Sequence, residues 1–207
     1  LDESAAVNQL VRAVRGLKAV DDVGLARHLP AFRATVTNVL IDDVAFSNAA
    51  YSLGTGVLEI NPITGLPLNM ADMVILTKNQ AILAYKIALA MGMESDFRTI
   101  MPQLAAVVGG GFLFRQIARG LVGLIPGLGI LPKVGVAFAG TYATGEAVRR
   151  WCAYGERLSA DALRGIYENA LERGRDIARS LLSRRAPEAR PARKEKRTLL
   201  PPPEKRR

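Results

Sequence analysis

The sequence predicts an all-α fold. Strand patterns are scarce, apolar residues recur at intervals of three and four, and glycine or proline interrupts the chain at helix-length intervals. Of the 207 residues, 49% are hydrophobic, which is enough to bury a substantial core. We expect about six helices, in which an apolar central helix packs on a glycine-rich helical hairpin, followed by a disordered basic C-terminal tail.

The first two expected helices make up an N-terminal region, residues 1–56. One runs from about Ala5 to Lys18, with Val7, Leu10, Val11, Val14 and Leu17 in a single apolar stripe. The other runs from about Pro30, a residue suited to a first helical turn, towards Leu53. We interpret residues 1–56 as N-terminal amphipathic helices that precede a helical domain, residues 57–183.

The third expected helix is the clearest. The segment Asn61–Pro67 is expected to be a loop, because each proline disfavours helix in the residue before it. Asn69 is a suitable N-cap with Asp72 three residues on, and Gly92 is a natural C-cap. Between them only Lys78, Asn79 and Lys86 form a polar strip. Protein or lipid should therefore enclose most of this helix.

Two polar residues, Thr77 and Gln80, lie three apart on the apolar side of this third helix. A functional interpretation is that they hydrogen-bond to another helix or to a partner domain. The alternative is an ordinary pair whose hydrogen bonds are satisfied inside the core.

A glycine-rich hairpin is expected next. Its helices run from Pro102 to about Ile125 and from Lys133 to about Ala153, and a proline-rich turn separates them. A helix-interior glycine costs about 1 kcal/mol relative to alanine, so the glycines need a reason, and close approach of two helices supplies one. The packing and turn residues are Gly120, Gly123, Pro126, Gly127, Gly129, Gly140 and Gly145.

The hairpin has features of a membrane-contacting segment. Its unbroken apolar pieces are about 12 residues or fewer, which as helix reach through about one leaflet. We interpret it as a re-entrant or shallow hairpin with Lys133 near its tip; a hairpin that stays soluble is the alternative. The interfacial residues that flank it would be Arg115, Arg119, Arg149, Arg150 and Trp151.

The sixth expected helix is capped by Ser159 and ends near Ser183. The tail, residues 184–207, holds ten basic residues against three acidic ones, which is +7 of the chain's net charge of +9. Such a tail suits an anionic membrane surface, or it serves only as a solubilising end. It has no aromatic residue on which bases could stack, so no specific nucleic-acid binding is expected.

Few residues could perform chemistry. The only histidine, His28, and the only cysteine, Cys152, have no partners in metal-ligand spacing, and a solvent-facing turn accounts for Asp42 and Asp43 better than an acid–base pair. We therefore predict no catalytic residues, no metal, no cofactor and no enzymatic activity. The sequence partly matches a phosphate-binding loop at Gly127, Gly129 and Lys133. However, no strand precedes these residues and the Ser or Thr that the motif requires is absent.

The segment from Val57 to Arg173 resembles the YcjF-like family, a helical domain of unknown function. The resemblance rests on Asn61–Gly65, on Ala71-Asp72, Leu76-Thr77 and Gln80, and on the glycine-rich run Leu124–Gly129 with Gly140, Tyr142, Ala143 and Gly145. Family members are helical, are often membrane proteins and frequently follow or neighbour a GTPase domain. The resemblance implies interaction roles for Asp72, Thr77 and Gln80 and assigns no catalytic residue.

These observations lead to one functional hypothesis and one alternative. The hypothesis is a non-catalytic domain that couples a GTPase domain, in cis or in trans, to the cytoplasmic face of the cell membrane. The chain begins at Leu1 rather than at Met, which indicates a fragment or a processed product; if it is the C-terminal part of a longer protein, the GTPase domain would lie before Leu1. The alternative is a soluble cytoplasmic helical interaction module or homo-oligomer with no membrane role.

Overall fold

The computed structural model describes residues 3–16, 21–58, 65–93, 96–108 and 130–185. Within these ranges the regular elements are all helices and no strand occurs, which confirms the all-α class. The elements in chain order are α1 (Glu3–Gly16), α2 (Asp22–His28), the 3-10 turn η1 (Pro30–Phe32), α3 (Arg33–Leu58), α4 (Gly65–Ala90), α5 (Phe97–Val108), α7 (Ile130–Tyr154) and α8 (Ala160–Arg185).

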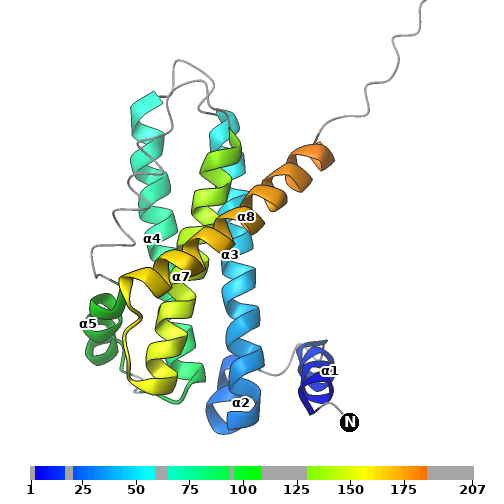
Figure 1. Cartoon of the computed structure of the whole chain (residues 1–207), viewed down its shortest axis with the longest axis vertical. Coiled ribbons are helices and arrows are strands. Elements are labelled where there is room, and N and C mark those ends of the chain that lie inside the picture. Colours follow the sequence, from blue (N-terminus) through cyan, green and yellow to red (C-terminus); the bar gives the residue numbers. More distant parts are fainter. Residues whose placement is uncertain (1–2, 17–20, 59–64, 94–95, 109–129, 186–207) are drawn as a thin grey trace, which may run out of the picture.

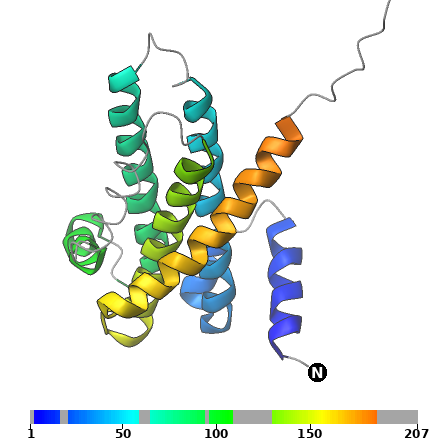
Figure 2. The ribbon, with the colours of Figure 1, turned by 45° about the horizontal axis from the view of Figure 1, so that its top comes forward.

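Helix α7 is central to the fold. It packs against α3 and α8 most extensively, and also against α4 and α5. Figures 1 and 2 show α3, α4 and α7 running lengthwise beside one another, with α8 crossing them obliquely and α5 on the flank of α4. The expected packing of the apolar third helix on the second arm of the hairpin is therefore present as the contact between α4 and α7.

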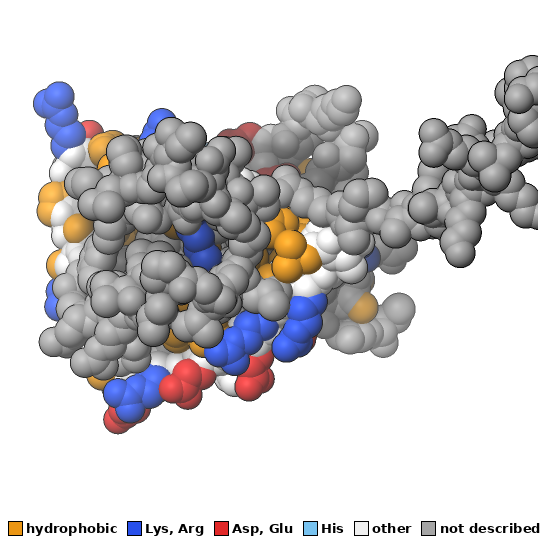
Figure 3. All heavy atoms as spheres, turned by 90° about the horizontal axis from the view of Figure 1, so that it is seen from above, with side chains coloured by type: hydrophobic (Ala, Val, Ile, Leu, Met, Phe, Trp, Pro, Cys, Tyr) orange, Lys and Arg blue, Asp and Glu red, His pale blue; other side chains and the backbone are white. Residues whose placement is uncertain are grey.

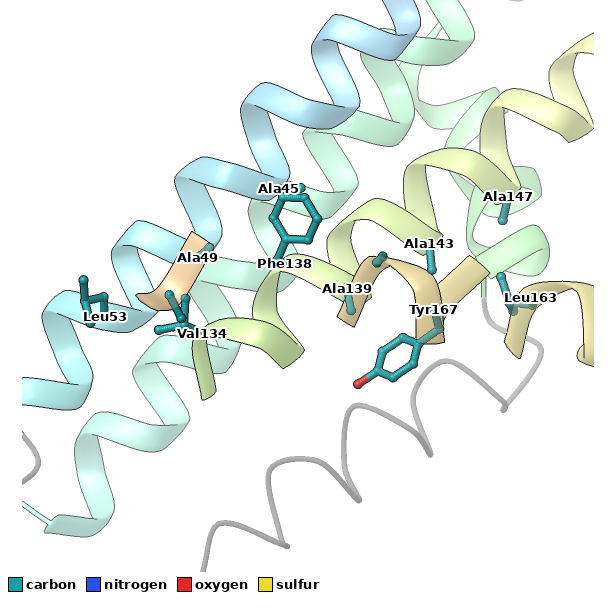
Figure 4. Packing of buried hydrophobic residues seen from close by; sticks show 12 residues of the cluster. Ala45, Ala49, Leu53, Val134, Phe138, Ala139, Ala143, Ala147, Leu163 and Tyr167 are labelled. Atoms are coloured by element: carbon teal, nitrogen blue, oxygen red, sulfur yellow. The ribbon is translucent and has the colours of Figure 1, made fainter. Parts of the chain in front are cut away.

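Two hydrophobic clusters lie on either side of α7. The first joins α3, α7 and α8 around Phe138 and Tyr167, with Ala45 and Ala49 from α3 (Figure 4). The second joins α3, α4, α5 and α7, and its largest fully buried side chains are Ile41, Leu83, Ile87, Ile100 and Leu104. Since α7 contributes to both clusters, it ties the two sides of the molecule together.

Several expected helix ends are confirmed. The Ser159 hydroxyl accepts a hydrogen bond from the backbone N–H of Ala162 at 3.2 Å, so it caps α8. Gly92 has φ +86°, and the N–H of Met93 reaches back to the carbonyl of Ala88 at 2.9 Å, as in a Schellman end. The apolar side chains of α8, among them Leu163, Tyr167 and Ala178, form its buried or half-buried face.

The proline-based boundaries were wrong in two places. Gly65, Leu66 and Pro67, expected in a loop, lie in the first turn of α4, so Asn69 is not its N-cap. The first turn has backbone N–H groups without helical partners, so a proline there loses no hydrogen bond. Likewise Pro132 lies in the first turn of α7. Lys133, which was expected near the tip of the hairpin, follows it and is 5% exposed.

Helix α5 also begins earlier than expected. It starts at Phe97 and holds Pro102 in its interior. Asp96 provides the reason, because its carboxylate accepts hydrogen bonds from the N–H of Thr99 at 2.9 Å and from the Thr99 hydroxyl at 2.6 Å. These bonds hold the pKa of Asp96 below its ordinary value. The short helix α2, capped by Asp21, was not expected.

Candidate interaction surface

The outer face of α4 carries a row of exposed side chains that alternate between aliphatic and basic. Val74, Lys78, Ile82 and Lys86 follow one another at intervals of four residues, so they are neighbours along one side of the helix over about 18 Å. Val74 is 68% exposed and Ile82 41%. Monomeric proteins do expose single hydrophobic residues, whereas exposed apolar side chains that lie next to one another can mark a surface that meets a partner.

Two more exposed apolar side chains extend this row. Ile75 lies beside it on α4, and Phe97, at the start of α5, packs edge-on against Tyr85 of α4 with ring centroids 5.1 Å apart. We call Val74, Ile75, Lys78, Ile82, Lys86 and Phe97 the α4 surface. In Figure 3 hydrophobic and basic side chains share the edge on the α4 side, while basic and acidic side chains gather together on the side where α8 crosses.

Behind the α4 surface, a chain of polar side chains connects α4 to the core. The Asn79 amide donates to the Asn48 side-chain carbonyl at 2.7 Å, and the Asn48 amide donates to the Thr141 hydroxyl at 2.8 Å. The Gln80 amide donates to the same hydroxyl at 3.3 Å. Asn79 therefore faces inward, and its expected place in a polar strip with Lys78 and Lys86 was wrong.

The three residues singled out for interaction have different surroundings. Gln80 is half-buried and bonds to α7 through Thr141, as polar contacts between helices do. Thr77 is exposed and lies at the wall of a cavity between α4, α5 and α7. Asp72 belongs to α4, but its side chain lies outside the described residues. The structure thus brings Thr77 and Gln80 to the same region.

The glycines of α7 permit close helix packing with α3 and α8. An added Cβ at Gly145 would lie 2.6 Å from the Cγ1 of Ile41 on α3, and one at Gly174 of α8 would lie 2.9 Å from the carbonyl oxygen of Gly135 on α7. Gly140 is buried, and its carbonyl accepts a hydrogen bond from the Thr144 hydroxyl at 2.8 Å. Close approach therefore joins α7 to α3 and α8, and the close packing expected along the hairpin stays a prediction, because most of its first arm lies outside the described residues.

Much of the predicted hairpin lies outside the described residues. This applies to its packing and turn positions Gly120, Gly123, Pro126, Gly127 and Gly129, and to the flanking Arg115 and Arg119. None of the described helices is long and apolar enough to span a bilayer.

The other flank of the predicted hairpin is the last part of α7. Arg149 pairs with Glu146 at 2.7 Å, and Arg150 is exposed. Trp151 is half-buried and packs against the second cluster, so its ring helps to hold α7 in place.

The charged groove between α3, α7 and α8 differs from the α4 surface, because its charges are paired. It encloses about 460 Å³. Arg173 pairs with Asp42 at 3.0 Å and lies 5.1 Å from the ring centroid of Tyr142. Burial, with the nearby negative charges of Glu146 and Asp42, raises the pKa of the Tyr142 hydroxyl. Ion pairs and cation–π contacts account for these side chains without a ligand.

Residues that could perform chemistry lie apart from one another. His28 is exposed, and Asp42 is exposed and engaged with Arg173. Cys152 is half-buried in the second cluster, and burial raises the pKa of its thiol to about 12, so it is protonated at neutral pH. Over the described ranges no three potential metal ligands come together.

Comparisons with known proteins returned no matching family model, no matching curated protein and no matching solved structure. The resemblance to the YcjF-like family therefore stays a prediction.

Sequence reasoning found α4 but missed which of its residues face outward. Protein or lipid was expected to enclose most of this helix outside a polar strip, and in the structure Val74, Ile75 and Ile82 are exposed. The repeat of aliphatic and basic residues at intervals of four was the available signal. No local pattern marks Phe97, because its exposure depends on how α5 packs beside α4.

Proposed function

We propose that this chain is a non-catalytic helical domain that binds the anionic cytoplasmic face of a membrane through its α4 surface and holds a GTPase domain there, in cis or in trans. The observation that carries the membrane part is the exposed row Val74, Lys78, Ile82 and Lys86 with Phe97 beside it. Exposed aliphatic side chains with lysines beside them can meet anionic lipid through both hydrophobic contact and charge.

Lysine suits this row because its side chain combines an apolar stem with a charged ammonium group. The apolar stem can lie along a hydrophobic surface while the ammonium group stays among lipid head groups. Lys78 and Lys86 stand on either side of Ile82 in the row, so both could contact phosphates while Ile82 enters the acyl boundary. Helix α4 would then lie flat on the membrane, which requires no spanning helix.

The expected binding is weak and reversible. Each basic residue near an anionic surface contributes about 1 kcal/mol. Each aliphatic or aromatic side chain that leaves water completely adds about 1.5–3 kcal/mol, and partial insertion adds less. The basic residues of 186–207 would add attraction of the same electrostatic kind, so binding should fall as salt rises.

The partner part of the proposal rests on the resemblance to the YcjF-like family alone. A domain without its own chemistry is useful at a membrane if it holds something else there. Purification of the full chain from its native cells after in-cell crosslinking, followed by mass spectrometry, should recover a GTPase or peptides of a GTPase domain in the same polypeptide. Repeated recovery of other proteins without any GTPase would contradict the proposal that the domain holds a GTPase at the membrane.

Vesicle co-sedimentation of the full chain tests the membrane part. Wild type should bind vesicles that contain phosphatidylserine and ignore vesicles of phosphatidylcholine alone. Val74→Asp/Ile82→Asp should lose most of this binding, since two carboxylates would enter the lipid boundary. Phe46→Asp, which alters an exposed apolar residue on α3, is the matched control and should bind like wild type.

Charge can be tested separately. Lys78→Glu/Lys86→Glu should weaken binding to anionic vesicles, whereas Arg12→Glu/Arg164→Glu changes the net charge equally at exposed positions of α1 and α8 and should weaken it less. Equal losses in the two double variants would mean that only net charge matters. A stable dimer that Val74→Asp/Ile82→Asp dissociates, with no vesicle binding by wild type, would establish the homo-oligomer instead.

A further inference from the structure

A cavity of about 150 Å³ lies between α4, α5 and α7, beneath the region of the α4 surface. Its apolar wall consists of three alanines and two larger side chains: Ala81, Ala84, Ala105, Met101 and Leu104. Ala84 and Leu104 are buried, while Ala105 is exposed. The cavity therefore has an apolar floor and reaches the surface between α4 and α5.

Two of the three polar residues at the wall already make hydrogen bonds within the protein. The Gln80 amide donates to Thr141, and the Thr144 hydroxyl donates to the carbonyl of Gly140 within α7. A water molecule needs two to four polar partners, and cavities lined by apolar side chains stay dry. An apolar cavity of about 150 Å³ is large enough to take a ligand the size of benzene.

The mouth of the cavity adjoins the α4 surface. Thr77, exposed at the wall, lies one turn after Val74 and directly before Lys78 in α4. Met101 lies one turn after Phe97 on the same side of α5. A molecule that enters here has its buried end against Ala84 and Leu104, and Lys78, which follows Thr77 in the chain, lies on the adjoining face of α4.

We infer that this cavity receives the end of an acyl chain whose anionic head group stays near Lys78. The chain could belong to a membrane phospholipid or to a free fatty acid, because both combine a hydrocarbon tail with an anion. The inference deepens the proposed function and, for the phospholipid source, depends on it. Withdrawing one chain end from the bilayer would fix the position of the domain on the membrane.

Trp151 provides a reporter, since it is the only tryptophan and packs against the cluster that contains Ala84 and Leu104. Bromine quenches tryptophan fluorescence at short range. In the full chain, 8-bromooctanoate should quench Trp151 in a saturable way, and unbrominated octanoate should displace it. Vesicles of phosphatidylserine brominated near the chain ends should quench as well if phospholipid is the source, and should not if only free fatty acid enters.

Ala105→Leu should abolish the quenching because the added side chain fills the cavity from its exposed rim. Ala106→Leu is the matched control, since Ala106 is exposed on α5 but does not line the cavity, and it should behave like wild type. Ala81→Leu, on the opposite wall, provides a second filling variant. Absence of saturable quenching in wild type, or equal quenching in Ala105→Leu and Ala106→Leu, would overturn the inference.

The two proposals fail in different ways. If the cavity inference alone is wrong, wild type binds anionic vesicles but shows no quenching by 8-bromooctanoate. If the membrane proposal alone is wrong, 8-bromooctanoate quenches Trp151 and Ala105→Leu abolishes the effect, yet no vesicle binds. Val74→Asp/Ile82→Asp should lose vesicle binding while it retains quenching by the free fatty acid.

Discussion

The two sides of α7 are built from the same small and aliphatic residues but packed differently. On the side of α3 and α8, glycine brings backbones together, with Gly135 and Gly174 at the crossing of α7 and α8. On the side of α4 and α5, a cavity lies between the helices and aliphatic side chains face outward. Apolar composition alone therefore does not decide whether a helix face is closed or open; the fit between particular residues does.

This difference suggests a division of labour. The closely packed side holds the bundle together. Interiors packed at crystal-like density tolerate little change in volume, so substitutions on this side should lower stability. The open side can accept a ligand or a lipid surface without disturbing that packing. If so, substitutions on the two sides should affect different measurements: stability on the first and binding on the second.

The largest loss of stability is expected from Gly174→Ala on the closed side. The new Cβ would lie 2.9 Å from the backbone oxygen of Gly135, and backbone cannot move aside as a flexible side chain can. Overpacking of this kind costs about 1–3 kcal/mol, which urea denaturation would measure. Gly165→Ala, on the same helix with nothing within 4 Å, should instead stabilise by up to about 1 kcal/mol. Equal effects of the two changes would refute close packing of α7 on α8.

The next effect concerns Asn48, which connects the two sides. Its amide group bonds to Thr141 of α7 and to Asn79 of α4, and the residue is fully buried. Asn48→Ala leaves both partners short of a hydrogen bond, at a cost of about 1–3 kcal/mol in the free energy of unfolding. Asn38→Ala, at an exposed position of the same helix, should stay within about 0.5 kcal/mol of wild type.

A smaller effect should appear at alkaline pH through Cys152, which packs in the cluster on the open side. Its pKa rises from 9.0 to about 12 on folding, so the unfolded chain ionises first. The associated stability is fully present below pH 9.0 and is lost as the pH rises towards 12. The urea midpoint of wild type should therefore fall over this interval more than that of Cys152→Ala. If the urea midpoints of wild type and Cys152→Ala fell equally over this interval, the Cys152 thiol would be as hydrated in the folded chain as in the unfolded chain.

Sequence reasoning predicted the fold class and most helices, because both follow from local periodicity. Ser159 and Gly92 also gave correct helix ends, since capping depends on neighbouring residues. The boundaries predicted from Pro67 and Pro102 were wrong, because the position of each proline within its helix mattered more than its presence. The residue that indicates the start of α5 is Asp96, whose carboxylate accepts a hydrogen bond from the N–H of Thr99.

The candidate site was harder to foresee because it depends on contacts between distant residues. Gln80 was singled out, but its partner Thr141 lies 61 residues away in the chain. The glycines were rightly taken as a sign of close helix packing, yet nothing local indicates that Gly145 faces Ile41 of α3. A cavity, likewise, is the space left by three helices and has no signature in any one of them.

The contrast between the two sides can be measured directly with an environment-sensitive fluorophore in the Cys152→Ala background. The fluorophore would be attached at Ile82→Cys on the α4 surface or at Phe46→Cys on α3, both of which replace exposed apolar residues. On addition of phosphatidylserine vesicles, we predict a blue shift of emission at position 82 and none at position 46. A blue shift confined to position 46, or equal shifts at both positions, would contradict the assignment of the α4 surface as the face that meets the membrane.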